Sequence, residues 1–122
     1  MIEMAVMYRN RRDANCDLNA FITKLIPLIR ECWDDMGLKG IRVLNGLAGG
    51  VVKSEPGFQA MIFLQFETRE ELRQAVLAHG ERLLLASTHH IDQTPVIQVS
   101  ELVAQSWPGQ MVAIRPNERR AS

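Results

Sequence analysis

The 122-residue sequence lacks an excess of charge of either sign, because its 14 Lys and Arg residues balance its 14 Asp and Glu residues. Nucleic-acid-binding proteins usually carry a basic excess, so we expect no nucleic-acid partner. No apolar run approaches the ~20 residues that cross a bilayer, so we expect no membrane-embedded segment. The chain has a charge at Glu3 and no signal peptide, which favours a cytoplasmic protein.

Cysteine and histidine are scarce, with two and three residues. Cys16 and Cys32 are too few for a disulfide framework, and Cys32 falls on an apolar helical stripe where a small core side chain is expected. The histidines form no tight cluster with cysteines or carboxylates, so the sequence supports a metal site only weakly and we expect none. The glycine-rich segment 46–54 lacks the glycine that a phosphate loop needs before its Lys-Ser pair, because Val52 stands there. We therefore expect a hairpin connection and no cofactor.

What the sequence does contain is enough apolar residues, 47%, for the core of one domain. Alternating apolar and polar residues predict four β-strands, over residues 2–8, 39–47, 58–67 and 96–103. Each half of the chain has the order strand, helix, strand. This order predicts an α+β, ferredoxin-like βαββαβ sandwich, in which both helices cover one face of an antiparallel four-stranded sheet.

Two helices are predicted between these strands. The first covers Asp17–Met36, with Asp17 as N-cap and a kink or a division near Pro27, which lacks a backbone N–H. Its apolar stripe has the three- and four-residue spacing of a helix and consists of Leu18, Phe21, Ile22, Leu25, Leu28, Ile29, Cys32 and Met36. The second begins with a capping box at Thr68 and Glu71, and we expect Gly80 to interrupt it. Its expected stripe is Leu72, Val76, His79 and Leu83.

The sheet face away from the helices carries Met61 and Phe63 in the third predicted strand. Leaving such side chains in water is unfavourable by ~25 cal/mol per Å² of apolar area. Face-to-face pairing of two sheets would bury them, so we expect a homodimer of dimeric α+β barrel type. A monomer with a solvated sheet face is the alternative.

Residues 104–122 form a C-terminal extension outside the expected domain, 1–103. The Trp107-Pro108-Gly109 sequence predicts a turn, and 111–114 is apolar enough to dock on its own sheet or on a partner. The last residues, 118–122, are expected to be frayed.

Several short segments resemble the EthD family, named for a protein of ethyl tert-butyl ether degradation, in the dimeric α+β barrel superfamily. The similar segments are Met7–Asn10, Ile26–Leu28, Gly37–Gly40, Gly46–Gly50, Ala78–Gly80 and, most specifically, Ile91–Glu101. The resemblance implies a homodimer that binds a small organic molecule in catabolic or secondary metabolism. It also implies the reaction range of cofactor-independent isomerases, lyases and oxygenase-like enzymes.

One position departs from this resemblance. Many EthD-like chains carry a histidine two residues before the helix proline, where this chain has Leu25. Leucine supports neither acid/base chemistry nor a polar contact, so a reaction that depends on that histidine cannot be carried over. The departure favours the alternative function, a non-catalytic accessory or ligand-sensing dimer.

Three residues are the candidates for proton transfer. Tyr8 ends a central strand. Either its hydroxyl reaches a cavity, or its ring belongs to the core and only the hydroxyl contacts water. His79 lies on the expected stripe of the second helix, where a structural role is the alternative. His90 lies in a polar loop near Asp92, whose carboxylate can orient an imidazole or bind ligand, and a solvated loop is the alternative.

Two more residues are candidates for ligand binding. Arg42 in the second strand can pair with a carboxylate of a ligand, or it is a surface charge. Trp107 can line a cavity or anchor the C-terminal extension.

Overall fold

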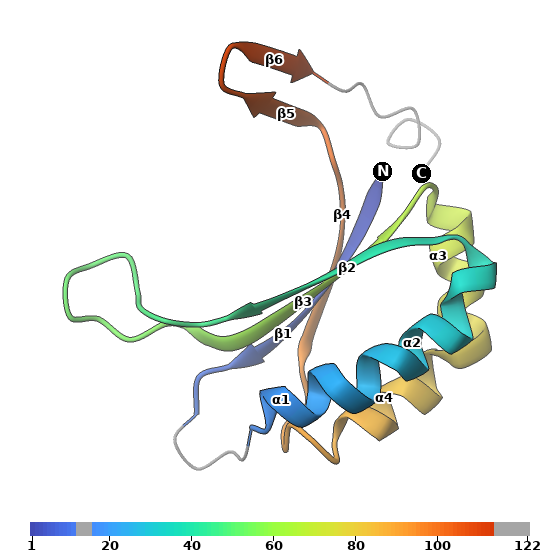
Figure 1. The fold of residues 1–122 in the computed structure, drawn as a ribbon, viewed down its shortest axis with the longest axis horizontal. Helices are drawn as coiled ribbons and strands as arrows, with labels where there is room; N and C mark the ends of the chain where they lie inside the picture. Colours follow the sequence, from blue (N-terminus) through green and yellow to red (C-terminus); the bar gives the residue numbers. More distant parts are fainter. Residues whose placement is uncertain (12–15, 114–122) are drawn as a thin grey trace.

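The computed structural model describes residues 1–11 and 16–113. A four-stranded antiparallel sheet has the order β2-β3-β1-β4, and the helices cover one of its faces (Figure 1). The strands are β1 (Ile2–Arg9), β2 (Leu38–Asn45), β3 (Phe58–Phe66), β4 (Val96–Glu101), β5 (Ala104–Trp107) and β6 (Gln110–Ala113). This arrangement confirms the predicted α+β ferredoxin-like fold.

The pairing register places alternate residues of β1 and β3 on the same face. Met4 pairs with Leu64, and Tyr8 pairs with Ala60, and all four side chains are buried toward the helices. Met7 pairs with Met61 on the other face, and both are half-buried. The predicted division of the strands into a core face and a half-apolar face is therefore confirmed.

The first helical segment is divided, as predicted. It consists of α1 (Leu18–Ala20), the π-helical turn η1 (Phe21–Leu25), α2 (Ile26–Trp33) and the 3₁₀ turn η2 (Asp34–Met36). The Asp17 carboxylate caps α1 by accepting a hydrogen bond from the Ala20 N–H at 3.0 Å. In the π turn the Ile26 N–H bonds to the Phe21 carbonyl, and Pro27, which has no N–H to donate, follows at the start of α2.

The phase of this segment corrects part of the predicted stripe. Ile22 is 45% exposed, whereas Trp33, which the stripe omitted, is 2% exposed. The π turn adds a residue to one turn of the helix and so changes which positions face the sheet. Phe21, Leu25 and Ile29 are buried as expected.

The second helical segment contains α3 (Arg69–Ala75), the π-helical turn η3 (Val76–Gly80) and α4 (Glu81–Ser87). The capping box at Thr68 and Glu71 is confirmed. The interruption expected at Gly80 takes the form of the π turn η3, which ends at Gly80 and separates α3 from α4, although Gly80 itself is helical, with φ −58° and ψ −46°. The stripe is also corrected, since the extra residue of η3 moves Val76, 40% exposed, away from the core.

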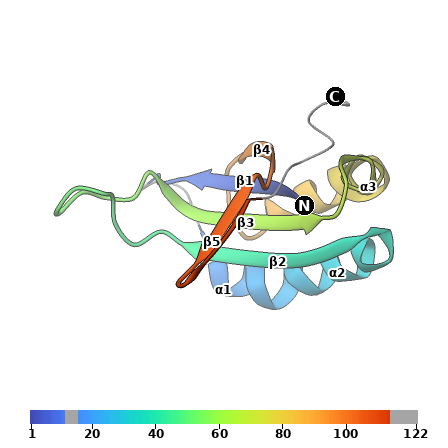
Figure 2. The same ribbon diagram turned by 90° about the horizontal axis from the view of Figure 1, so that it is seen from above.

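Residues 104–113, in the predicted C-terminal extension, form a second sheet of two strands, the β5–β6 hairpin. Gly109 occupies the left-handed region at φ +77°, which glycine adopts without strain, and it completes the predicted turn. The hairpin projects from the end of β4 and runs across the direction of the main strands (Figures 1 and 2). The predicted frayed end, 118–122, lies outside the described residues. None of the described helices has the length and apolarity needed to span a membrane.

Candidate ligand-binding cavity

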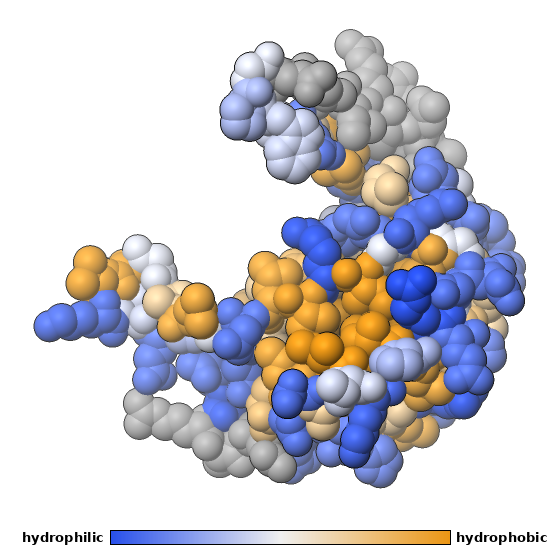
Figure 3. Space-filling model, in the orientation of Figure 1, coloured by the Kyte–Doolittle hydropathy of each residue, from blue (hydrophilic) through white to orange (hydrophobic). Residues whose placement is uncertain are grey.

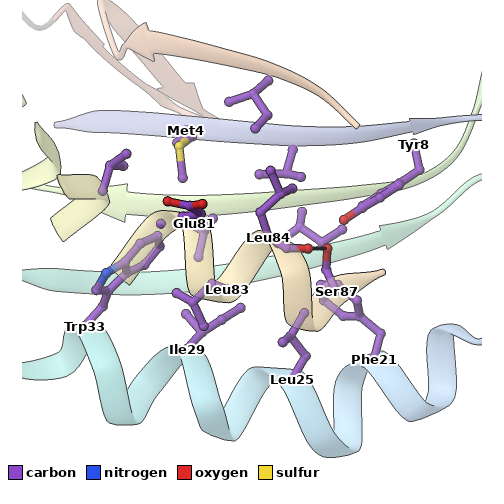
Figure 4. Close-up of a pocket in the computed structure, with 16 residues that line it drawn as sticks. Met4, Tyr8, Phe21, Leu25, Ile29, Trp33, Glu81, Leu83, Leu84 and Ser87 are labelled. Carbon is purple, nitrogen blue, oxygen red and sulfur yellow. Dashed lines mark hydrogen bonds between the residues drawn. The ribbon is translucent and has the colours of Figure 1, made fainter. Parts of the chain in front are cut away.

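A cavity of about 320 Å³ lies between the helices and the sheet, and we call it the helix–sheet cavity (Figure 4). Its walls are almost entirely apolar. The sheet contributes Met4, Val6, Tyr8, Ile62, Leu64 and Ile97, and the helical layer contributes Phe21, Leu25, Ile29, Trp33, Val76, Gly80, Glu81, Leu83, Leu84 and Ser87.

Both π-helical turns border this cavity. Phe21 and Leu25 come from η1, and Val76 and Gly80 come from η3. A π turn widens the helix locally and occurs frequently at functional sites. The two turns therefore alter the spacing and phase of both helices at the level where the cavity lies.

The cavity opens between the β4 edge and the second helical segment. The exposed lining residues lie there: Val76, Leu84 and Ile97 are 40%, 37% and 48% exposed, and Glu81 is exposed as well. The lining residues at its two ends, Tyr8 and Trp33, are 1% and 2% exposed (Figure 4). A molecule that fills the cavity would thus lie with one end against Tyr8.

Polar groups at the Tyr8 end come from Tyr8 and Ser87, whose hydroxyls lie near each other (Figure 4). The Ser87 Oγ donates a hydrogen bond to the Leu84 carbonyl at 2.6 Å. Burial raises the pKa of the Tyr8 phenol, and hydrogen bonding with Ser87 opposes part of that rise. Tyr8 is therefore a protonated phenol at neutral pH and is suited to donate a hydrogen bond.

Trp33 lies at the opposite end of the cavity from Tyr8 (Figure 4). Its indole N–H donates to the Ala75 carbonyl at 2.9 Å, and its ring meets Phe66 edge to face with centroids 5.8 Å apart. These contacts join α2 to α3 and to β3. They fix the distance between the helical layer and the sheet, and the side chains between the two layers leave the helix–sheet cavity unfilled.

The structure places the three candidates for proton transfer in different environments. Tyr8 lines the helix–sheet cavity. His79 is half-buried in η3, and the position that the predicted stripe gave it, facing the core, is taken by its neighbour Gly80, which lines the cavity. His90 and the exposed Asp92 lie in the connection before β4, and neither is a lining residue.

Arg42 and Trp107, the two further ligand-binding candidates, come together in a second hollow of about 430 Å³. It lies between the hairpin and the sheet face away from the helices. The Arg42 guanidinium pairs with the Glu3 carboxylate at 3.3 Å and lies over the Phe63 ring, 4.8 Å from its centroid. Gln65 donates to the same carboxylate at 2.9 Å, so Glu3 is held by two side chains.

Sequence reasoning missed Glu81 and Ser87 as cavity residues. Ser87 is not part of any recognisable sequence motif, and the sequence pattern predicts Glu81 to be an ordinary exposed residue of a helix. Leu25, identified as the site of a missing histidine, does line the cavity and is 3% exposed. No group of three side chains suited to a metal ion occurs among residues 1–11 and 16–113.

Comparison with solved structures gives EthD-like neighbours. An EthD-like protein from Ralstonia eutropha JMP134 is 27% identical, with a TM-score of 0.77 over 84% of this chain and 91% of that chain. An EthD family protein from Bacillus halodurans C-125 is 18% identical, with a TM-score of 0.64 over 84% and 98%. An Arabidopsis thaliana protein is 12% identical, with a TM-score of 0.57. No protein-family model and no curated protein matches the sequence. The predicted resemblance to EthD-like proteins is confirmed.

Proposed function

We propose that this chain, whose structural neighbours are EthD-like proteins, binds a small, largely apolar organic molecule in the helix–sheet cavity. The observation that carries the proposal is the cavity itself. Protein interiors are normally packed to the density of organic crystals, so a space of about 320 Å³ inside a chain of 122 residues needs an explanation. Its volume and its apolar walls match those of ligand pockets.

The lining favours an uncharged ligand. Among the described residues, the ionisable side chains that line it are Tyr8 and Glu81, and Tyr8 is a neutral phenol whose pKa burial raises further. Glu81 is exposed at the rim, where its carboxylate repels an anion. A carbonyl or ether oxygen of the ligand would accept a hydrogen bond from Tyr8, while the rest of the molecule contacts apolar walls.

For catalysis we propose a proton transfer without a cofactor, in the isomerase or lyase range that the resemblance implies. Tyr8 would donate a hydrogen bond to a carbonyl oxygen of the substrate and stabilise the charge that develops there. Glu81 at the rim would accept a proton from a carbon that lies nearer the mouth and is conjugated with this carbonyl, and return it to another carbon of the conjugated system in an isomerisation. His79 and His90 have no part in this scheme, because neither lines the cavity.

Non-catalytic ligand sensing is the second candidate function. Leu25 favours it, because this side chain faces the cavity from η1 and can neither donate nor accept a proton. Both functions use the same cavity, and we propose that both use a homodimer with its sheets face to face. The support for the homodimer is the half-apolar sheet face that the helices leave uncovered.

Two dyes with one ring skeleton test the binding proposal. N-phenyl-1-naphthylamine is neutral, and 8-anilino-1-naphthalenesulfonate adds a negative sulfonate. We expect fluorescence enhancement with a Kd in the micromolar range for the neutral dye and at least about tenfold weaker binding of the sulfonate. Equal affinity for both dyes would contradict the proposed role of Glu81, and Glu81→Gln should narrow the difference.

A blocking variant and its matched control locate the site. Val6→Phe adds a ring inside the cavity and should abolish binding of the neutral dye, while native mass spectrometry should show loss of any co-purified molecule. Val103→Phe makes the same change at a 47% exposed position and should bind like the wild type. Unchanged binding in Val6→Phe would overturn the proposal.

The retained molecule, once identified, separates the two functions. In an enzyme, incubation with the protein converts it, and Tyr8→Phe slows that conversion while dye binding persists. In a ligand-sensing module it is recovered unchanged. Turnover that is unaffected in Tyr8→Phe would refute the proton-transfer scheme and leave the binding proposal intact.

A further inference from the structure

The sheet face away from the helices, here called the open face, lies between two projections of the same chain. One is the connection between β2 and β3, and the other is the β5–β6 hairpin, and together they bound a concave space (Figure 3). The open face carries half-buried Ala5, Met7, Met61 and Phe63 and 41% exposed Leu44. It is therefore an apolar surface with a raised border at each end.

The hairpin stands over this face and does not extend the main sheet. Gln105 and Trp107 of β5 share the second hollow with Glu3, Arg42 and Gln65 of the open face. Trp107 is 58% exposed, so its ring finds only part of its packing within its own chain. Exposed tryptophans on projecting segments are typical anchors of protein interfaces.

Charge favours a neutral partner surface. The Arg42 guanidinium and the Glu3 carboxylate neutralise each other at 3.3 Å, so neither attracts a strongly acidic or basic partner. The whole chain also has zero formal net charge, and two copies do not repel each other over long distances. A second copy of this chain offers the same neutral, half-apolar face.

The area of such an interface points to a role for the hairpin. Four strands of about eight residues, at about 3.3 Å per residue and 4.8 Å between strands, give the open face roughly 500 Å². Two faces in contact bury roughly 1,000 Å², which is at the lower limit for a stable interface. Two hairpins with four-residue strands, each packed on the other copy, add roughly 500 Å² and bring the interface to standard size.

We propose that the β5–β6 hairpin is an exchanged arm, which packs against the second copy in a two-fold dimer and buries Trp107 there. Each copy gives one arm and receives one, because a two-fold interface uses the same patch on both subunits. The inference rests on the proposed homodimer and adds to it the segment that makes the dimer stable. It assigns Trp107 to the interface and leaves the helix–sheet cavity to the ligand.

The two tryptophans of the chain make the arm observable. Trp33 is 2% exposed in the core in either state, so a change of emission on dissociation reports Trp107. We would dilute the full-length protein from high micromolar to nanomolar concentration and follow its mass by mass photometry and its emission maximum together. We expect a red shift of several nanometres that coincides with dissociation of the dimer.

A pair of variants completes the test. Trp107→Ala should weaken the dimer at least about tenfold, the effect of an interface anchor, with unchanged circular dichroism and unchanged dye binding. Leu85→Ala removes a 62% exposed side chain from α4, on the helical side, and should leave the dimer affinity unchanged.

The outcomes separate the arm from the dimer. If the dimer dissociates without a shift in emission, or if Trp107→Ala leaves its affinity unchanged, the proposal of an exchanged arm is overturned and the homodimer is retained. A monomer at all concentrations overturns both. An equal loss of affinity in Leu85→Ala assigns the interface to the helical side and also overturns the arm.

Discussion

Placing a histidine at Leu25 tests whether this position faces an apolar cavity. Leu25 is 3% exposed and lines the helix–sheet cavity from η1. Leu25→His replaces an apolar side chain with an imidazole that has one donor and one acceptor nitrogen. The substitution also introduces the residue that many EthD-like chains carry here.

The expected cost follows from burial and from hydrogen bonding. Loss of the leucine side chain removes about 1.5–3 kcal/mol of burial free energy. An unsatisfied imidazole nitrogen costs a further ~1–3 kcal/mol, although the open mouth of the cavity lets water reach part of the ring. The two terms sum to about 2.5–6 kcal/mol, and because water satisfies part of the imidazole we expect the free energy of unfolding to fall by about 2.5–4 kcal/mol at pH 8.

The penalty should grow on acidification. A low-dielectric site disfavours the imidazolium, so the pKa of the introduced imidazole is lower in the folded than in the unfolded protein. The pKa of histidine in the unfolded protein is about 6.5, so the unfolded state binds the proton first as the pH falls below this value. The free energy of unfolding then decreases by up to about 1.4 kcal/mol per pH unit, until the folded protein also binds the proton. Stability relative to wild type is thus greatest above pH 7 and lost between pH 6.5 and the folded pKa.

Urea denaturation at pH 8, 6.5 and 5 measures both effects, with Ile22→His as the control. Ile22 lies in the same π turn but is 45% exposed, so its substitution should change the free energy of unfolding by less than about 0.5 kcal/mol at every pH. A Leu25→His protein that loses less than this control, or shows no dependence on pH, would refute the inward orientation of position 25.

Three further predictions concern single contacts. Tyr8 is the only tyrosine, so absorbance at 295 nm reports its titration, and we expect a midpoint above 10 in the folded protein and near 10 in urea. Because the unfolded state loses the phenol proton first, the free energy of unfolding should fall as pH rises above about 10, and Tyr8→Phe should reduce that fall. Thr68→Ala removes the hydroxyl that caps α3 and should cost about 1 kcal/mol in urea denaturation, whereas an unchanged midpoint would show that the cap contributes nothing. Trp33→Phe leaves the Ala75 carbonyl without its indole donor and should cost about 1–3 kcal/mol, and a smaller loss would mean that water replaces the bond.

The fold was predictable because its signals are local and repeated. The two-residue alternation in β1 and β3 identifies the buried face of each strand, and the structure buries Ile2, Met4 and Tyr8 as that pattern requires. The caps at Asp17 and Thr68 were predictable for the same reason, since each depends on residues no more than three positions away.

The helical phase was not predictable beyond the first turns. The expected stripe assumed 3.6 residues per turn, and each π-helical turn breaks that period by one residue. In the first helix Pro27 signalled an irregularity, although not its type. In the second helix Gly80 suggested a break, whereas the change of phase lies in the five residues Val76–Gly80, all of which stay helical.

The cavity lay beyond sequence reasoning for a different reason. A cavity is defined by volume that side chains leave unfilled, and the residues around it carry the same apolar pattern as a packed core. Phe21, Leu25 and Ile29 read as core residues, and they are buried residues that also face the space. Among these lining residues only Tyr8, which carries a hydroxyl on a predicted core strand, could be identified from the sequence as a buried residue with a functional group.

The two π turns connect the errors in phase with the cavity that the sequence did not reveal. With regular α-helical geometry, Val76 would face the core and His79 would follow it, which is the stripe that the sequence predicts. With η3 in place, Val76 lies at the rim, and Gly80, which has no side chain, faces the space instead. The same extra residue thus removes an imidazole from the interior and leaves room in the helix–sheet cavity. Restoring the α-helical phase by deletion of one residue in η3 should therefore reduce binding of the neutral dye while the sheet is retained, which separates the cavity from the fold that surrounds it.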